Sequence, residues 1–224
     1  MTRKLLHFIG ICAIAAVMLA AAPAGATGGM ATVNVVHGIP GVAVNVCVDG
    51  HSVADNFKYT NTIMGTQLPA GAHGVKLVAA GAPCTASAIL AKKYTLADGV
   101  NDTIVANLDA SGTANLLAFG NDVRKVDAGM ARLTVRHTAE APAVNVWANG
   151  SKLIGGTSFT WSASRKFDVP AGCYRVKVTL PGSGKAVIGP VTLHLSAGKA
   201  YQVYAVGSAG HFRLVALATP VGTK

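Results

Sequence analysis

Apolar and polar residues alternate along short stretches through most of the chain. Residues 33–37 and 133–137 each carry apolar side chains and a terminal His at one parity, and mainly polar side chains at the other. Residues 44–49 and 144–149 alternate in the same way. Alternation with a period of two is typical of half-buried β-strands. Since no long stretch has a helical period, the pattern predicts an all-β protein.

Turn signals separate these stretches at short intervals. Asp49-Gly50 and Asn149-Gly150 follow an alternating stretch, and both central residues of such a hairpin turn need positive φ. Pro-Ala-Gly and a later turn ending in Gly recur in both halves of the chain. Short strands with closely spaced turns favour a small β-sandwich. We therefore expect two tandem Ig-like β-sandwich domains.

The two halves are copies of one another. Residues 31–50 align with residues 131–150 without a gap, and eight of the 20 positions are identical. A self-similarity of this length is the mark of a duplicated structural unit. The expected domains are residues 27–120 and 131–220, joined by a polar linker at 121–130.

The N-terminus has the features of a secretory signal peptide. Arg3 and Lys4 precede an apolar run at 5–22, and a small-x-small site follows at 24–26. This order favours a leader at 1–26 that is cleaved on export, with a retained membrane anchor as the alternative. We expect no membrane span in the mature protein and a secreted, periplasmic or cell-surface location.

Charge is distributed unevenly between the halves. The chain has a net charge of +10; residues 27–122 hold 4 Lys/Arg and 6 Asp/Glu, and residues 123–224 hold 13 and 3. A basic half in an exported protein predicts contact with anionic envelope polymers or another surface protein. The alternative is a solvated basic surface without a dedicated partner. Nucleic acid is not expected, because the basic residues are dispersed and not clustered with aromatics.

Three cysteines follow the leader. A disulfide between Cys47 and Cys84 is expected in an oxidising compartment, and closing that loop contributes about 3–4 kcal/mol. Trp147 stands at the position of Cys47 in the second copy. Cys173 is then unpaired, which leaves three interpretations: a free buried thiol, an inter-domain partner or a dimer link.

The polar residues common to both copies predict structure and not chemistry. His37 and His137 end equivalent strands without another ligand at metal-binding spacing, so we expect them to bond to loop backbone. Asn45 and Asn145 are expected to make cross-strand or loop hydrogen bonds. Hydrolase motifs and phosphate-binding loops are missing from the sequence, and it has 9 Asp and Glu in all. We expect no catalytic residues, no metal site and no cofactor.

These features resemble the domain of unknown function 4397. The resemblance rests on the strand ending in His, on Val-Asn-Val-x-Val-Asp-Gly at 44–50, and on the later Leu-Pro-Ala-Gly and Leu-x-x-Gly signals. It covers about 31–120 and 131–218. The resemblance implies an exported bacterial protein with tandem domains and no established activity. Asn45 and Asn145 depart from the Asp that is usual in the family.

Two functions remain to be distinguished. The first is an exported non-catalytic structural or binding module of the cell envelope or extracellular space, whose basic second copy contacts anionic polymers. The alternative is a carbohydrate-interacting accessory domain or weak hydrolase. It would use exposed aromatic side chains of the second copy as sugar platforms, namely Trp147, Trp161, Tyr174 and Phe159.

Overall fold

The computed structural model describes residues 28–155, 157 and 159–224, and these residues form sixteen β-strands in four four-stranded sheets. The predicted leader lies outside the described residues. The strands of the first repeat are β1 (Met30–His37), β2 (Val44–Val48), β3 (His51–Phe57), β4 (Thr62–Pro69), β5 (Gly71–Ala79), β6 (Leu90–Leu96), β7 (Asn101–Leu108) and β8 (Ala114–Gly120). Those of the second are β9 (Met130–His137), β10 (Asn145–Ala148), β11 (Ser151–Ile154), β12 (Ser164–Pro170), β13 (Gly172–Thr179), β14 (Ala186–Leu195), β15 (Lys199–Val206) and β16 (Arg213–Pro220). The fold is all-β, as expected.

Each repeat is a sandwich of two sheets, and the two repeats have the same topology. The strand orders are β4-β1-β7-β8 and β3-β2-β5-β6 in the first repeat, and β12-β9-β15-β16 and β11-β10-β13-β14 in the second. The pairs β1–β7 and β9–β15 are parallel, whereas the other strand pairs are antiparallel. Asp49 and Asn149 adopt φ of 51° and 49° before their glycines, so the two hairpin turns that the sequence predicts are both present.

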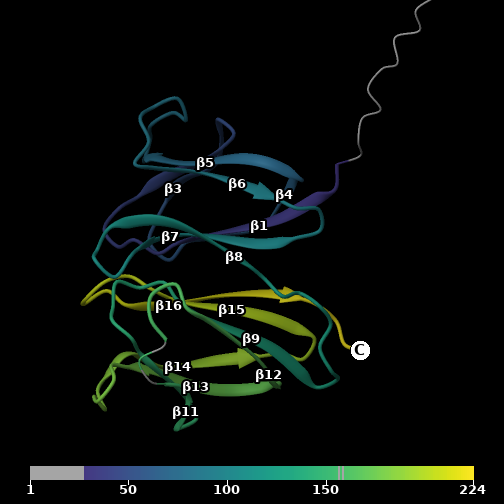
Figure 1. The fold of residues 1–224 in the computed structure, drawn as a ribbon, viewed down its shortest axis with the longest axis vertical. Helices are drawn as coiled ribbons and strands as arrows, with labels where there is room; N and C mark the ends of the chain where they lie inside the picture. Colours follow the sequence, from purple (N-terminus) through teal and green to yellow (C-terminus); the bar gives the residue numbers. More distant parts are fainter. Residues whose placement is uncertain (1–27, 156, 158) are drawn as a thin grey trace, which may run out of the picture.

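The four sheets stack as four layers, as Figure 1 shows. The outer layers are the sheets that contain β5 and β13, and the inner layers are those that contain β1 and β9. Each sandwich has a core of its own, and a third apolar cluster lies between the two inner sheets. This cluster consists of Val36, Val105, Tyr204, Val206, Val215 and Leu217.

The inner strands are therefore buried on both faces. Residues 32–37 of β1 and 131–137 of β9 are almost all buried, at both parities. The expectation of half-buried strands is wrong here, because the face that alternation assigned to solvent is covered by the other repeat. This packing makes the two repeats one body and sets the outer sheets at its opposite ends.

Arg136 is the main polar contact between the repeats. It extends from β9 and donates hydrogen bonds to the carbonyl oxygen of Gly120 at the end of the first repeat (2.6 Å) and to Asn121 Oδ1 at the start of the predicted linker (2.7 Å). Its guanidinium also lies 4.8 Å from the ring centre of Phe119 and 5.3 Å from that of Tyr204. A buried cation is tolerated when donors find acceptors and its faces lie on aromatic rings.

Each repeat contributes one aromatic side chain that bonds to the backbone of the other repeat. Tyr59 of the first repeat bonds to the carbonyl oxygen of His211, in the β15–β16 loop of the second. Trp161 of the second repeat donates to the carbonyl oxygen of Leu108, where β7 ends in the first (3.0 Å). Tyr59 and Trp161 occupy the same position, since each precedes a residue with positive φ, Thr60 or Ser162. The repeats therefore meet as two nearly equivalent halves.

The segment predicted as a linker bonds to both repeats, and Asn121 Nδ2 donates to Asn101 Oδ1 (2.7 Å) and Thr103 Oγ1 (2.9 Å) on β7 of the first. Asp122 accepts charged hydrogen bonds from Arg132 on β9 (2.9 Å) and Lys166 on β12 (2.6 Å). Val126 pairs with Thr223 near the C-terminus in an isolated parallel bridge. Together with the Arg136 contact to Asn121, these bonds hold the connection in place.

Candidate functional site

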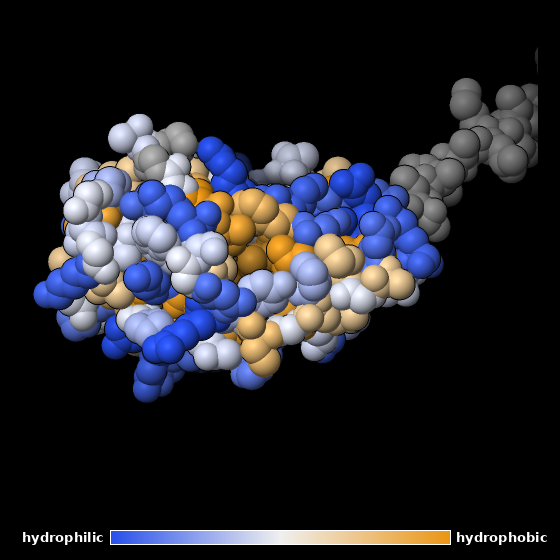
Figure 2. Space-filling model, turned by 90° about the horizontal axis from the view of Figure 1, so that it is seen from below, coloured by the Kyte–Doolittle hydropathy of each residue, from blue (hydrophilic) through white to orange (hydrophobic). Residues whose placement is uncertain are grey.

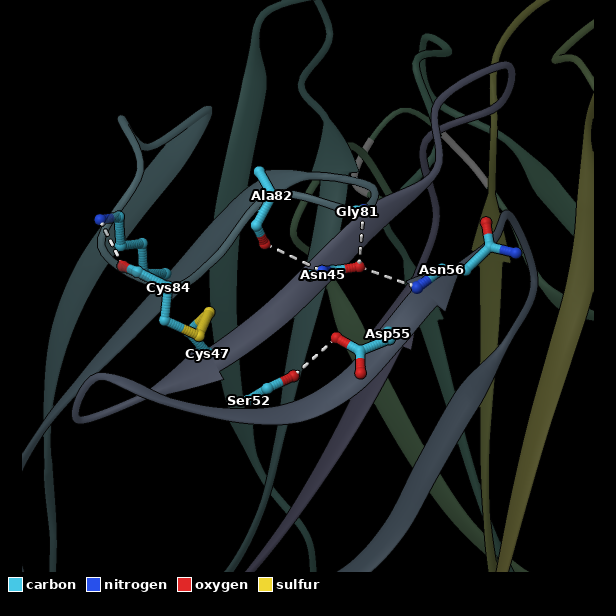
Figure 3. Close-up of a disulfide and its surroundings, with 9 residues drawn as sticks. Asn45, Cys47, Ser52, Asp55, Asn56, Gly81, Ala82 and Cys84 are labelled. Carbon is cyan, nitrogen blue, oxygen red and sulfur yellow. Dashed lines mark hydrogen bonds between the residues drawn. A yellow bond between two sulfur atoms is a disulfide. The ribbon is translucent and has the colours of Figure 1, made fainter.

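The disulfide expected between Cys47 and Cys84 is present, and it joins β2 to the loop after β5 (Figure 3). Cys47 is fully buried and the two Cα atoms are 5.8 Å apart. Lys76 Nζ donates to the carbonyl oxygen of Cys84 (2.9 Å), which fixes the loop further. The disulfide therefore ties the loop between β5 and β6 to β2 in the outer sheet of the first repeat.

Asn45 lies beside the disulfide and bonds both to the loop after β5 and to the end of β3, as Figure 3 shows. Its Nδ2 donates to the carbonyl oxygen of Ala82 (3.0 Å), and its Oδ1 accepts from the backbone N–H of Asn56 (2.9 Å). Asn145 is at the matching position on β10 and is buried to the same extent, 6%. These contacts assign Asn45 the loop-bonding role that the sequence suggested.

His37 and His137 are buried inside their repeats. His37 Nδ1 accepts from the backbone N–H of Ile39 (3.3 Å), and His137 Nε2 lies 2.9 Å from the carbonyl oxygen of Pro142. Burial lowers the pKa of both rings. Both side chains thus organise the loop that follows their strand. Among the described residues, no three His, Cys, Asp or Glu side chains gather as a metal site would require.

A titratable pair that the sequence analysis missed lies in the first repeat. His73 Nδ1 contacts Asp49 Oδ2 (2.6 Å) and its Nε2 contacts the carbonyl oxygen of Pro69 (2.7 Å). Both partners can only accept, so the ring carries both protons, and the bond to Asp49 raises the pKa of His73. In the second repeat Tyr174 takes the place of His73 and donates to Pro170 (2.7 Å). The alignment of the two Pro-Ala-Gly turns was the signal in the sequence that could have revealed this position. Because His73 and Tyr174 both bond to the carbonyl oxygen of the turn proline, we assign them a structural role.

The aromatic residues proposed as sugar platforms are placed apart from one another. Phe159 is 1% exposed in the second core, and Trp161 is engaged with the first repeat. Tyr174 packs against the core from β13, whereas Trp147 pairs with Lys177 on the outer face of the same sheet. These four side chains therefore form no common exposed row, and the geometry does not favour the sugar-platform alternative.

Trp147 is instead the centre of a cationic surface. The ammonium groups of Lys152 and Lys177 each lie 5.2 Å from its ring centre, and its Nε1 donates to Thr179 Oγ1 (3.0 Å). Arg175 lines the same shallow hollow as Trp147 and Lys177. We call the outer surface of this sheet the cationic face; its cations are Lys152, Arg175 and Lys177, and Lys185 lies in the loop between β13 and β14.

Negative charge is missing from this sheet. Residues 145–154 and 172–195, which contain all four of its strands, include neither Asp nor Glu. The nearest acid in the sequence, Asp168, lies on β12 of the other sheet and pairs with Arg132 at 2.9 Å. The cations of the face are therefore not neutralised by carboxylates of their own sheet.

Cys173 is free and exposed at one end of the cationic face. It pairs across the sheet with His194, and its Sγ lies 3.2 Å from His194 Nδ1. The structure thus excludes the buried-thiol interpretation and pairing with Cys47 or Cys84, which are bonded to each other. Its exposure leaves the dimer link open.

No helix long and apolar enough to cross a membrane occurs in the part of the chain that the structure describes.

Comparisons with known proteins give two weak structural matches and one family match. Two solved structures resemble the chain weakly: the TIE protein of Bacillus anthracis (11% identity, TM-score 0.24) and a Bacteroides eggerthii protein whose name proposes a role in cell adhesion (8%, 0.23). The first match covers 83% of this chain and 34% of the other, so this chain spans about a third of that protein; the second covers 88% and 98%. No curated protein matches in sequence. The family described as domain of unknown function DUF4397 matches residues 31–146 and 138–223. The chain therefore belongs to the DUF4397 family and carries its domain in two tandem copies.

Proposed function

We propose that this protein is a non-catalytic binding module of the cell envelope or extracellular space, and that its second repeat binds anionic surface polymers. The observation that carries the proposal is the cationic face, a β-sheet that bears Lys152, Arg175 and Lys177 and has no carboxylate. Figure 2 looks at this end of the molecule and shows strongly hydrophilic residues over much of it.

The arrangement of the cations suits a polymer with repeated negative charges. Arg175 and Lys177 project from the same side of β13, and alternate residues of a strand are about 7 Å apart. Lys152 extends the positive charge across β10 to β11. The ring of Trp147 holds two of the ammonium groups in position, each contact worth about 0.5–1 kcal/mol at an exposed site. Pre-positioned cations lose less entropy when an anion binds.

The remaining polar groups support a binding role over catalysis. His37, His137, Asn45 and the His73–Asp49 pair are engaged with backbone or with one another. The disulfide supports an oxidising location, such as the periplasm, the cell surface or the medium.

Polyphosphate is a suitable probe of the proposal. The wild-type protein is expected to bind it at about 50 mM salt and to lose most of that affinity at about 500 mM, because salt screens exposed charges. The triple variant Lys152→Gln, Arg175→Gln, Lys177→Gln is expected to bind at least about tenfold more weakly, since each lost charge contact adds to the loss. Calorimetry would measure both effects.

A matched control removes three exposed lysines elsewhere: Lys58→Gln, Lys93→Gln and Lys125→Gln. It has the same net charge as the first triple variant and is expected to retain binding within about twofold. Equal losses in both triple variants would show attraction to net charge alone and would contradict a specific face. Absence of binding at low salt would contradict the proposal as a whole.

A further inference from the structure

The two sandwiches differ at the side where β6 and β8, or β14 and β16, form the sheet edges. In the first repeat this side is closed by two polar side chains of β6. Lys92 Nζ and the Tyr94 hydroxyl both donate to the carbonyl oxygen of Leu116 on β8, at 3.0 and 3.2 Å. Burial raises the pKa of Tyr94 to about 12, which agrees with a phenol inserted between the sheets.

The second repeat lacks this closure. Leu96 and Leu195 are equivalent, so Val191 and Leu193 stand where the first repeat has Lys92 and Tyr94. An apolar furrow of about 390 Å³ lies between β14 and β16. Its lining is mostly apolar, from Val187, Ile188, Val191, Leu193, Phe212 and Leu214, and Arg213 adds one positive charge.

The furrow is both exposed and deep. Val191 is 37% exposed at its rim, while Leu193 and Leu214 also border a narrow apolar space inside the core of the repeat. Figure 2 shows hydrophobic residues in a strip bordered by hydrophilic ones at this end of the molecule. Contiguous exposed apolar surface of this kind marks a binding groove, and the volume is within the range of small-molecule sites.

A single strand separates the furrow from the cationic face. Ala186 and Pro190 of β14 line the hollow beside Trp147, Arg175 and Lys177, whereas Val187 and Gly189 of the same strand line the furrow. The strand packs closely against β13 at Gly189, where a Cβ would lie 2.6 Å from the carbonyl oxygen of Val176. An apolar groove and an acid-free cationic hollow are thus adjacent across one strand.

We propose that the furrow binds the single alkyl chain of an anionic amphiphile, whose phosphate or carboxylate headgroup lies in the cationic hollow. The headgroup contact rests on the proposed function of the cationic face, whereas the alkyl-chain contact rests on the furrow itself. The charge beside the furrow selects this occupant over a neutral or cationic amphiphile. The apolar lining selects it over a free anion.

Dodecyl phosphate below its micelle concentration is the probe, titrated into the full mature chain by calorimetry. It is expected to bind at one site per molecule, at least about tenfold more tightly than inorganic phosphate or dodecyltrimethylammonium. Equal binding of dodecyl maltoside would overturn the headgroup assignment. A stoichiometry well above one would overturn the single site.

Ala216→Trp fills the furrow from its exposed rim without changing a core residue, and is expected to weaken dodecyl phosphate binding at least about tenfold. Ala118→Trp is the matched control, since Ala118 is the exposed equivalent on β8. The control is expected to bind as the wild type does. Equal affinity of the Ala216→Trp and Ala118→Trp variants would overturn the proposal.

The two polar side chains that close the first repeat, Lys92 and Tyr94, can also be introduced at the equivalent positions of the second repeat. The double variant Val191→Lys, Leu193→Tyr is expected to lose dodecyl phosphate binding although it gains a positive charge, and to keep polyphosphate binding. The two proposals can therefore fail separately. Loss of polyphosphate binding alone contradicts the polymer function, whereas furrow variants that still bind dodecyl phosphate contradict the alkyl site.

Discussion

Arg136 lies between the two inner sheets, and the residue is 2% exposed. Burial lowers its pKa, while hydrogen bonds to Tyr204, Gly120 and Asn121 compensate part of the desolvation. Removing such a side chain leaves its acceptors buried without a donor. The charge is therefore held in place by both repeats together.

Arg136→Ala is expected to lower the free energy of unfolding by about 3 kcal/mol, because it combines a lost charged hydrogen-bond network with a cavity. Chemical denaturation would measure the change. Lys125→Ala, at an exposed position, is expected to change stability by less than about 0.5 kcal/mol. An Arg136→Ala protein as stable as the control would contradict the role assigned to the network.

The buried histidines predict a stability that falls in acid. Burial lowers the folded-state pKa of His37 and His137 below the ordinary histidine value of about 6.5, so the unfolded chain binds more protons as the pH drops through that value. The stability that they contribute is full above about pH 6.5 and is lost progressively below it. His37→Gln or His137→Gln is expected to flatten this dependence between about pH 7.5 and pH 5.

His73 is the internal comparison because its shift has the opposite sign. Its pKa is raised by the bond to Asp49, so its contribution is full below pH 6.5 and is lost as the pH rises through the folded-state pKa. His73→Gln is therefore expected to steepen the acid loss. Denaturation midpoints of the three variants across this pH range give the signs, and the same sign for His73 and His137 would contradict the assignment.

At the scale of elements, the disulfide tests how the first repeat is stabilised. The double variant Cys47→Ala, Cys84→Ala is expected to lower the free energy of unfolding by about 3–4 kcal/mol, because the unfolded chain regains the entropy of the closed loop. Cys173→Ser is the control, and its stability should match the wild type. Denatured, unreduced mature protein is expected to titrate one thiol per chain; three would contradict the bond.

The strands, hairpin turns and tandem sandwiches could be predicted from alternation and turn residues, since these depend on local sequence. The contact between the repeats could not. The outward positions of β1, β9 and β15 include Asn34, Thr134 and Gln202, which are the residue types of a solvated face. The furrow was also missed, although the aligned repeats differ visibly at Lys92 and Val191. The sequence pattern does not indicate which sheet edges the tertiary structure leaves uncovered.

At the scale of the whole molecule, the shared cluster predicts that the repeats unfold together. Tryptophan fluorescence reports on Trp161 at the interface and on Trp147 in the outer sheet of the second repeat, and far-ultraviolet circular dichroism reports on both sandwiches. The two signals are expected to give one common thermal midpoint, as a cooperative unit requires. Tyr204→Ala removes the largest side chain that is fully buried among the described residues, and it is expected to give the two signals different midpoints. Two transitions in the wild type would contradict the single unit.

The near-equivalence of the two halves has a consequence for the surface on which they pair. A pair of identical chains must be self-complementary, so any residue near the axis meets its own image. Here Val36 joins an apolar cluster while Arg136, at the same repeat position, carries a buried charge. Two halves within one polypeptide are free of that constraint, so equivalent positions of the paired surface can carry different side chains. The contact at the Val36 and Arg136 positions is therefore asymmetric, and each half presents to the other a surface that differs from its own.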